Sequence, residues 1–325
     1  MITLTLGELM VRTEAVLIDS GAAPAVAHTV ARALVTAEAD GHDGHGLVRL
    51  SSYAAQLRTG KIDGRAEPEL YVVRPGTCRI DGRNGFAYPA LDVAVEWLLA
   101  VAPVQGVAAA GVFHSGHCGA MGLIVERLAR AGMVGLMVAN TPAAMAPWGA
   151  RRALYGTNPI ACALPFNPDP VVIDLSLSKV ARGQVLAAQR RETSIPVGWA
   201  LDFDGKPTTD PTVALAGTMV PLGDAKGAAL ALMVEAMAAG LTGAQYSAQA
   251  SSFIDANGDP PATGQMLIAI PPTACGGSAD HLASLFDEVA QSPGARLPGI
   301  GRFARRRQAE IDGLQIDPRW FNKGA

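Results

Sequence analysis

Gly106-Val-Ala-Ala-Ala-Gly-Val-Phe113 is an unbroken apolar run, and His114-Ser-Gly-His-Cys-Gly-Ala-Met-Gly122 follows it directly. The first run predicts a buried β-strand, and residues 117–131 predict a helix immediately after it. Small residues at a helix N-terminus let backbone N–H groups approach a phosphate, whose negative charge the helix dipole favours. Close packing of the helix without any ligand explains these glycines equally well.

The glycine spacing in this stretch, G-x-x-G-x-x-G, differs from the G-x-G-x-x-G of a Rossmann fold. The next predicted strand, residues 133–140, ends in Asn140, where a Rossmann fold places an acid for the ribose. We therefore do not expect a standard Rossmann fold.

Outward from this stretch, apolar strands alternate with helices. Such near-continuous apolar strands indicate a sheet with helices on both faces. The chain has 325 residues, more than one domain usually holds, so we expect either two lobes or one core with an added helical piece. The predicted strands are 69–73, 77–80, 106–113, 133–140, 160–164, 171–174 and 266–270, and the predicted helices are 6–20, 25–39, 47–58, 90–102, 117–131, 180–190, 225–241 and 279–291. Residues 195–221 are rich in turn signals.

The composition excludes several classes of protein. A formal net charge of −3 gives no reason to expect nucleic acid or an anionic membrane as a partner. The four cysteines lie far apart without a C-x-x-C pair, which favours a reducing compartment. No basic region followed by an apolar block opens the chain, and charged residues interrupt the apolar windows 91–112 and 227–243. We therefore expect a cytoplasmic protein without membrane spans.

The chemistry is expected in Asp40-Gly-His-Asp-Gly-His-Gly-Leu-Val-Arg49, at the end of the second predicted helix. A histidine moves protons near neutral pH, and an arginine binds a carboxylate through two parallel hydrogen bonds. A polar helix end whose histidines cap carbonyls is the plainer interpretation. A third is a metal site shared by two H-x-x-H pairs, formed by His42, His45, His114 and His117. The H-E-x-x-H motif of zinc hydrolases is absent from the sequence.

Later polar segments are candidate ligand contacts. Thr157 and Asn158 lie in a loop before an apolar strand, and either bind a ligand or form an Asx-type turn. Asp174-Leu-Ser176 follows a strand end, where open α/β sheets bind ligands, although Asp174 also suits a helix N-cap. Lys226-Gly227 and the basic tail 296–307 are candidate phosphate contacts, or simply solvated faces.

Taken together, these motifs resemble the malate/L-lactate dehydrogenase type-2 family, which includes ureidoglycolate and sulfolactate dehydrogenases and Δ1-piperideine/Δ1-pyrroline-2-carboxylate reductases. Each matching segment is weak alone, but together they follow the family's order across nearly the whole chain. The segments are 43–49, 117–120, 146–149, 156–160, Asp174 with 181–183, 195–200, 204–211, 221–223 with Lys226-Gly227, and 296–299.

This resemblance implies a non-Rossmann α/β fold, with a mixed sheet covered by helices and an N-terminal helical region. The expected division is 1–75, carrying the catalytic motif, and 76–325, carrying the NAD(P) and substrate region, with the C-terminal segment packing back on the N-terminal part. It also implies a homodimer with its active site near the subunit interface.

The activity implied is NAD(P)H-dependent reduction of a small 2-oxo acid or cyclic 2-imino acid, with NADPH slightly favoured by the basic tail. His45 is then the proton donor and Arg49 holds the substrate carboxylate, while no metal is expected. The implied cofactor-lining residues are His117, Cys118, Gly119, Ala120, Met121, Thr157, Asp174, Leu175, Ser176, Lys226, Gly227, Arg296 and Arg302.

Two positions depart from the ketimine reductases of the family. Those enzymes carry a serine before the histidine and an aspartate further along, where this chain has Gly44 and Gln184. Gln184 donates and accepts hydrogen bonds but takes up no charge. The sequence therefore leaves the substrate open, and a family member that binds dinucleotide without reductase activity remains an alternative, beside a metal-dependent hydrolase or lyase.

Overall fold

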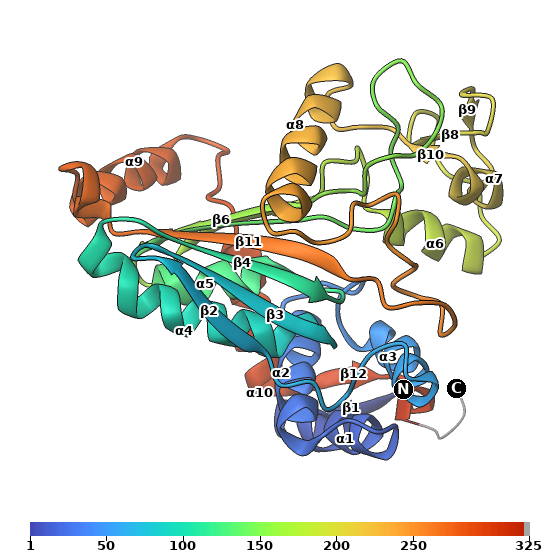
Figure 1. Cartoon of the computed structure of the whole chain (residues 1–325), viewed down its shortest axis with the longest axis horizontal. Coiled ribbons are helices and arrows are strands. Elements are labelled where there is room, and N and C mark those ends of the chain that lie inside the picture. Colours follow the sequence, from blue (N-terminus) through green and yellow to red (C-terminus); the bar gives the residue numbers. More distant parts are fainter. Residues whose placement is uncertain (322–325) are drawn as a thin grey trace.

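The computed structural model describes residues 1–321, and a seven-stranded mixed sheet lies at its centre (Figure 1). The strand order is β2-β3-β4-β11-β5-β6-β7. Only β3 and β4 pair in parallel; the other neighbours are antiparallel. The bounds are β2 Glu69–Arg74, β3 Thr77–Gly85, β4 Ala108–Ser115, β5 Val134–Ala139, β6 Ile160–Leu164, β7 Val171–Leu175 and β11 Thr263–Ile270.

Two helices, α4 (Ala87–Gln105) and α5 (Gly122–Arg130), cover one face of this sheet (Figure 1). By length and hydropathy, α4 is the one helix within residues 1–321 able to cross a membrane. Its Leu91, Val95 and Leu98 are fully buried in the main core with Ile80 and Val112 of the sheet. Burial of this apolar helix face accounts for its composition as a core element.

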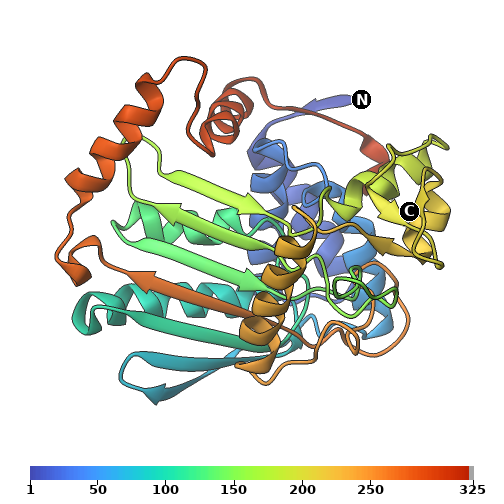
Figure 2. The ribbon, with the colours of Figure 1, turned by 90° about the horizontal axis from the view of Figure 1, so that it is seen from above.

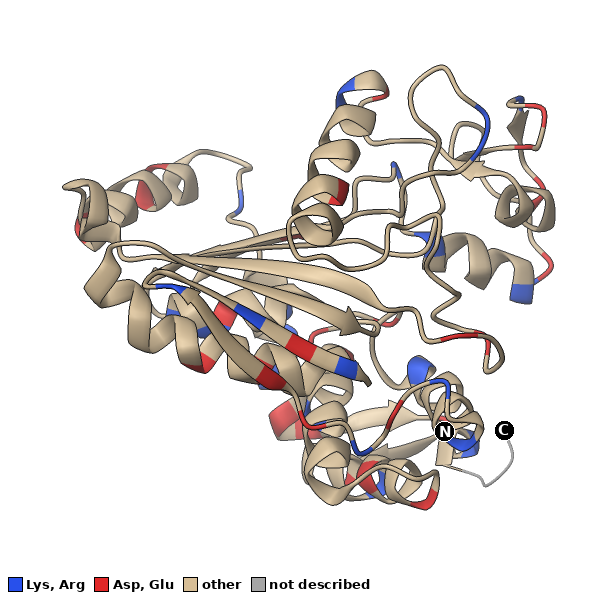
Figure 3. Cartoon of the chain, in the orientation of Figure 1, with Lys and Arg blue, Asp and Glu red and all other residues tan. Residues whose placement is uncertain are grey.

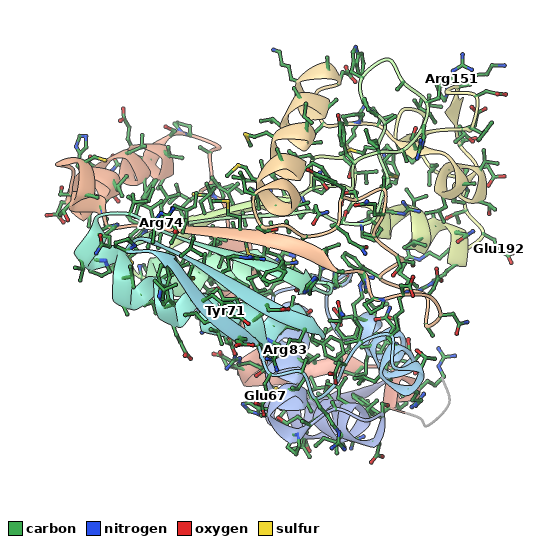
Figure 4. All side chains as sticks on the ribbon, in the orientation of Figure 1. Glu67, Tyr71, Arg74, Arg83, Arg151 and Glu192 are labelled. Carbon is green, nitrogen blue, oxygen red and sulfur yellow. The ribbon has the colours of Figure 1, made fainter. Side chains whose placement is uncertain are left out.

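The opposite face is covered only in part. α8 (Ala225–Glu235) and the π-helix Ala236–Gly240 lie over one end of it, and charged residues occur along the β2–β3 hairpin (Figure 3). Tyr71 and Arg83 lie along that outer hairpin (Figure 4). The two faces of the sheet are therefore covered unequally, whereas the apolar strands predicted helices on both.

A second lobe adjoins α8 and has its own core, which includes Leu177, Val185 and Met219. The region that the sequence marks as turn-rich, 195–221, contains a small sheet and a short helix here. The small sheet has the strand order β10-β8-β9. The elements of the whole lobe are α6 Arg182–Arg190, β8 Ala200–Leu201, β9 Pro207–Thr208, α7 Pro211–Ala216 and β10 Thr218–Met219.

The N-terminal region forms a helical layer around a separate core (Figure 2). β1 (Ile2–Leu4) pairs antiparallel with β12 (Leu314–Ile316), so the last described strand lies beside the first. The other elements are α1 Leu6–Asp19, α2 Pro24–Ala39, the 3₁₀ helix Leu47–Arg49, α3 Leu50–Thr59 and, from the C-terminal part, α10 Ile300–Asp312. A projecting helix, α9 (Ala279–Gln291), and two 3₁₀ turns, Pro272–Cys275 and Pro318–Phe321, complete the described chain.

Three predicted helices differ from those observed. The helix predicted over 117–131 begins only at Gly122, because Gly119 takes a left-handed φ of +66° that a helix cannot continue through. The helix predicted over 47–58 opens with a 3₁₀ turn and then runs to Thr59. The one predicted over 225–241 changes to a π-helix after Glu235.

Candidate active site

A buried ion network fixes the start of the segment Asp40–Arg49, which we call the catalytic loop. Asp40 is fully buried at the end of α2 and accepts hydrogen bonds from Nε and Nη2 of Arg306 at 2.6 and 2.7 Å. Arg306 also donates to Glu126 of α5, at 2.9 Å from both Nη1 and Nη2. Arg302 lies between the same two carboxylates, with Nε 3.1 Å from Asp40 and Nη2 2.5 Å from Glu126. Helix α10 therefore ties the loop to the sheet.

Glu38 holds the other end of the catalytic loop. Burial raises the pKa of its carboxyl. Its Oε2 accepts the Leu47 amide at 2.9 Å, and a Cβ at Gly46 would overlap the same carboxylate. A larger residue at this step between His45 and the 3₁₀ turn would therefore displace the Glu38 carboxylate from the Leu47 amide.

Arg49 presents a free guanidinium face near His45. Its Nε donates to the Gly44 carbonyl at 2.7 Å, and no carboxylate within residues 1–321 lies within 4.0 Å of its nitrogens. An arginine whose Nε is held by a backbone carbonyl, and which lacks an ion pair, keeps its two Nη groups for an anion.

His45 stacks on His117, with ring centroids 5.4 Å apart and planes inclined by 13°. The Tyr53 hydroxyl lies 2.6 Å from Nδ1 of His117 and 3.0 Å from the Tyr88 hydroxyl. A further ring, Phe253, contacts His117 at a centroid distance of 5.2 Å. These five side chains come from the catalytic loop, α3, α4, the loop before α5 and the loop before β11.

Both stacked histidines are neutral at physiological pH. Burial, followed by the charges of Arg49 and His42, lowers the pKa of His45 to about 3. Burial and Arg49 also hold the pKa of His117 well below its ordinary value. The Nδ1 of His45 is buried without a partner, so the ring has a free polar atom for a ligand.

A second polar cluster adjoins the catalytic loop. Asp174 Oδ2 accepts the Gly122 amide at 2.7 Å, and burial raises the pKa of its carboxyl. A Cβ at Gly122 would overlap Arg302 Nη1, which is itself buried without a partner, as is His42 Nε2. The helix N-terminus predicted to receive a phosphate is therefore capped by Asp174. The unpaired nitrogens of Arg302 and His42 beside it suit an anionic or hydroxyl-bearing ligand.

Backbone hydrogen bonds join the remaining predicted cofactor segments. The Leu177 amide donates to the Thr157 carbonyl at 2.8 Å, and the Leu222 amide donates to the Leu177 carbonyl at 2.8 Å. This brings Leu175 and Ser176 beside Thr157 and beside the turn that precedes Lys226-Gly227. Lys226 is exposed, and Gly227 is buried where a Cβ would overlap the Leu222 carbonyl. These three segments therefore lie side by side, and we call them the rim.

Other predicted residues lie apart from this rim or below it. Cys118, Ala120 and Met121 belong to the loop that precedes α5, and they are buried. Arg296 is exposed beside Leu297, which packs with Val171 at the start of β7 rather than at its end. Of the predicted arginines, only Arg302 lies next to Asp174.

The four-histidine metal site is not formed. Among residues 1–321, no group of three or more His, Cys, Asp or Glu side chains is placed to hold a metal ion. His114 lies at the end of β4, where its Nδ1 is 3.1 Å from Asp81 Oδ1, and His45 stacks on His117 instead. The two H-x-x-H pairs therefore do not come together as one four-histidine cluster in the described part of the chain.

Sequence reasoning missed Tyr53, Tyr88, Phe253 and Glu38. Tyr53 had a usable signal, because it follows Arg49 by four residues and so lies on the same helical face. Phe253 had none, since it is far from His45 in sequence and lies in a loop without a recognisable motif.

Comparison with known proteins gives matches over nearly the whole chain. The chain is 49% identical over 284 residues to the (2R)-3-sulfolactate dehydrogenase (NADP(+)) of Chromohalobacter salexigens, and the match covers 87% of this chain and 85% of the relative. It is 39% identical over 323 residues to the Δ1-pyrroline-2-carboxylate/Δ1-piperideine-2-carboxylate reductase of Pseudomonas aeruginosa, covering 97% and 96%.

Solved structures agree with these relatives. The Δ1-piperideine-2-carboxylate reductase from Pseudomonas syringae superposes with a TM-score of 0.93 at 35% identity, over 98% of each chain. The sulfolactate dehydrogenase from Methanocaldococcus jannaschii gives 0.88 at 30% identity, over 98% of this chain and 94% of that one. Residues 4–323 match the malate/L-lactate dehydrogenase family, and with the fold, the loop His45–Arg49 and these relatives in agreement, the chain belongs to that family.

Proposed function

We propose that the protein is an NADPH-linked oxidoreductase that interconverts a small 2-oxo acid and its 2-hydroxy acid. The observation that carries this proposal is the pairing of a half-buried His45, whose pKa is lowered to about 3, with an Arg49 that has no carboxylate partner within the described chain. One group suits proton transfer at the reacting oxygen, and the other suits a substrate carboxylate.

In this proposal the dinucleotide supplies the hydride that reaches the carbonyl carbon of the substrate. Arg49 holds the substrate carboxylate, and His45 gives its proton to the oxygen, so that the C=O bond becomes CH–OH. The substrate carboxylate offsets the positive charge of Arg49, which lowers the pKa of His45 in the free protein. Binding therefore favours protonation of His45 from solvent. In the oxidative direction, the neutral ring accepts the hydroxyl proton directly.

The proposed cofactor contacts are the rim, which consists of Thr157, Asp174–Ser176 and Lys226-Gly227, together with the loop His117–Met121 and with Arg302 beside Asp174. NADPH is favoured over NADH, because a relative 49% identical is described as NADP(+)-dependent. The arginines of α10 next to the rim add positive charge that suits an extra phosphate.

A 2-oxo acid is favoured over a cyclic 2-imino acid by what surrounds His45. Gly44 faces open space, with nothing within 4 Å of the position of a Cβ. Gln184 is exposed on α6 and bears no ionisable group. Neither position therefore offers the second proton carrier that the ketimine reductases of the family have. The identity with the sulfolactate dehydrogenase points to the same substrate class.

We further propose a cytoplasmic homodimer. The exposed apolar residues of α8, Leu230, Leu232 and Met233, support a partner subunit on the sheet face that the chain itself leaves partly open. The cysteines are all unpaired, which suits a reducing compartment. We assign residues 1–75 to the catalytic motif and 76–325 to the cofactor and substrate region.

The proposal is tested by an oxidation screen of NADPH and NADH. The acceptors are pyruvate, oxaloacetate, 3-sulfopyruvate, phenylpyruvate and the two cyclic imines, Δ1-pyrroline-2-carboxylate and Δ1-piperideine-2-carboxylate. We expect turnover of an oxo acid with NADPH and little or none of the imines. Quenching of dinucleotide fluorescence without turnover of any acceptor would instead identify a binding protein that has lost the reductase activity.

A further inference from the structure

The loop Ser251–Asp259 descends from the second lobe onto α3 and reaches the stacked histidines (Figure 1, orange). We call it the Phe253 loop. It is closed at its base by the Ser251 hydroxyl, which donates to the Asp259 carbonyl at 2.6 Å. The amides of Ile254 and Asp255 donate to the Ser252 hydroxyl at 3.1 and 3.2 Å. These bonds give the loop a defined shape and leave Phe253 half-buried against His117.

Lys61 anchors this loop from below. The residue is only 3% exposed, and its ammonium donates to three carbonyls, those of Ser252 at 2.8 Å, Asp255 at 2.9 Å and Asn257 at 3.1 Å. No carboxylate within residues 1–321 lies within 4.0 Å of this nitrogen. All three ammonium donors are thus used on one loop.

Burial lowers the pKa of Lys61, and the charge of Asp255 opposes that shift from beyond ion-pair distance. Burying an ammonium without a direct ion pair is costly, and an apolar side chain of similar size would pack in its place at lower cost. Convergence of three carbonyls on one point, however, fixes a loop that has no regular secondary structure. We therefore interpret the buried Lys61 as a residue that positions the loop, since its burial alone would not stabilise the fold.

Helix α3 couples this anchor to the catalytic centre. Gln56 Nε2 donates to the Asp255 carbonyl at 3.1 Å, and the Thr59 hydroxyl donates to the Ala256 carbonyl at 2.7 Å. The same helix carries Tyr53, whose hydroxyl bonds His117. One rigid element therefore sets both the orientation of His117 and the height of the Phe253 loop above it.

We propose that the Phe253 loop is the wall that selects the substrate side chain, with Phe253 as the specificity-determining residue and Lys61 as its positioning residue. This inference rests on the proposed 2-oxo acid activity. In a 2-oxo acid the carbonyl oxygen, the carboxylate and the side chain are the three substituents of one planar carbon and diverge from it. With the carboxylate at Arg49 and the oxygen at His45, the third substituent, the side chain, is left facing the Phe253 loop, because Phe253 packs on His117 and His117 stacks on His45. An aromatic ring there limits the length and bulk of the substrate.

The test compares kcat/KM for 2-oxo acids of increasing side chain: pyruvate, 2-oxobutyrate, 4-methyl-2-oxopentanoate and phenylpyruvate. In Phe253→Ala we expect the ratio of phenylpyruvate to pyruvate to rise about tenfold or more, as expected when an apolar pocket is enlarged. Lys61→Met should shift the ratio in the same direction. The matched control Lys206→Met, at an exposed lysine of the second lobe, should leave the ratio unchanged.

A purely structural role of these residues would lower all four values equally and leave the ratio unchanged, which would overturn the inference. Thr59→Val, which removes one exposed anchoring bond, serves if Lys61→Met does not fold. Amide hydrogen exchange of residues 252–257 gives a readout without substrate: it should be faster in Lys61→Met and Thr59→Val than in the wild type. Equal protection in either variant overturns the anchoring role.

A wild type that reduces none of these acids or imines overturns the proposed function itself, whereas an active wild type with an unchanged ratio in Phe253→Ala overturns only the present inference.

Discussion

His45 and His117 lie face to face at 5.4 Å, although 71 residues of chain separate them and they belong to different layers of the fold. Stacking of two neutral imidazoles excludes water from one face of His45 and fixes the direction of its free nitrogen. Because Tyr53 in turn holds His117, α3 orients His45, the proposed proton-transfer group, without being bonded to it.

Replacing His45 removes the proposed proton donor. We expect His45→Ala to lower kcat for oxo acid reduction by about 10²–10⁴-fold, the usual contribution of general acid catalysis. The dissociation constant for NADPH, measured by fluorescence quenching, should change little. His281→Ala, at an exposed histidine of α9, is the matched control. Full turnover by His45→Ala would show that another group donates the proton.

The low pKa of His45 predicts opposite pH profiles for the two directions. With a pKa of about 3 in the free protein, the protonated fraction falls about tenfold for each pH unit above that value. We expect log kcat/KM for reduction to fall with a slope of about −1 between roughly pH 5 and 8, since kcat/KM reports ionisations of the free enzyme. Oxidation of the 2-hydroxy acid needs the neutral ring and should be flat in that range. A plateau for reduction between about pH 5 and 6 would mean that the donor has an ordinary histidine pKa.

Arg49 is expected to act on binding rather than on stability. Arg49→Met should raise KM for 2-oxo acids by about tenfold or more, because charge-assisted hydrogen bonds contribute roughly 1.5–3 kcal/mol each. The midpoint of urea unfolding should stay close to that of the wild type, since Arg49 has no ion pair to lose among residues 1–321. Arg58→Met, in the exposed last turn of α3, controls for loss of charge. Equal KM values in the two variants would exclude the carboxylate role.

Arg306 and its neighbour Arg307 provide a matched pair for stability. Arg306 is mostly buried between Asp40 and Glu126, whose carboxylates hold its pKa above the ordinary value, while Arg307 pairs with Asp169 at the surface. Arg306→Met should lower the free energy of unfolding by about 3 kcal/mol, because it leaves buried charge only partly compensated. Arg307→Met should cost at most about 1 kcal/mol, as is usual for exposed ion pairs. Similar losses in urea titrations of the two variants would contradict a structural role for the network.

The sequence predicted the family fold and most elements, because apolar strands and helix ends are local features. It also predicted that His45 and Arg49 share one short loop, since four residues separate them. It could not predict that Asp174 caps α5, because the Gly122–Asp174 contact depends on how β7 is placed in the sheet. The start of α5 was misplaced for a related reason: a left-handed Gly119 beside Tyr88 is set by packing between layers and not by helix propensity.

The contact of Phe253 with His117 could not be predicted from the sequence at all. Nothing in the residues around it indicates an active-site role, and only the three carbonyls gathered by Lys61 bring it to His117. Lys61 itself reads as an ordinary surface lysine after a helix, and its burial follows from the tertiary fold.

The ion network of α10 has a consequence for synthesis of the protein. Asp40 is made early, but both of its arginine partners, Arg302 and Arg306, lie near the end of the chain. While those residues are still within the ribosome, the acid at the base of the catalytic loop has no counter-charge and the loop cannot settle. A product truncated before residue 302 therefore carries an uncompensated acid at Asp40, which keeps the loop at this end of α2 open to proteases.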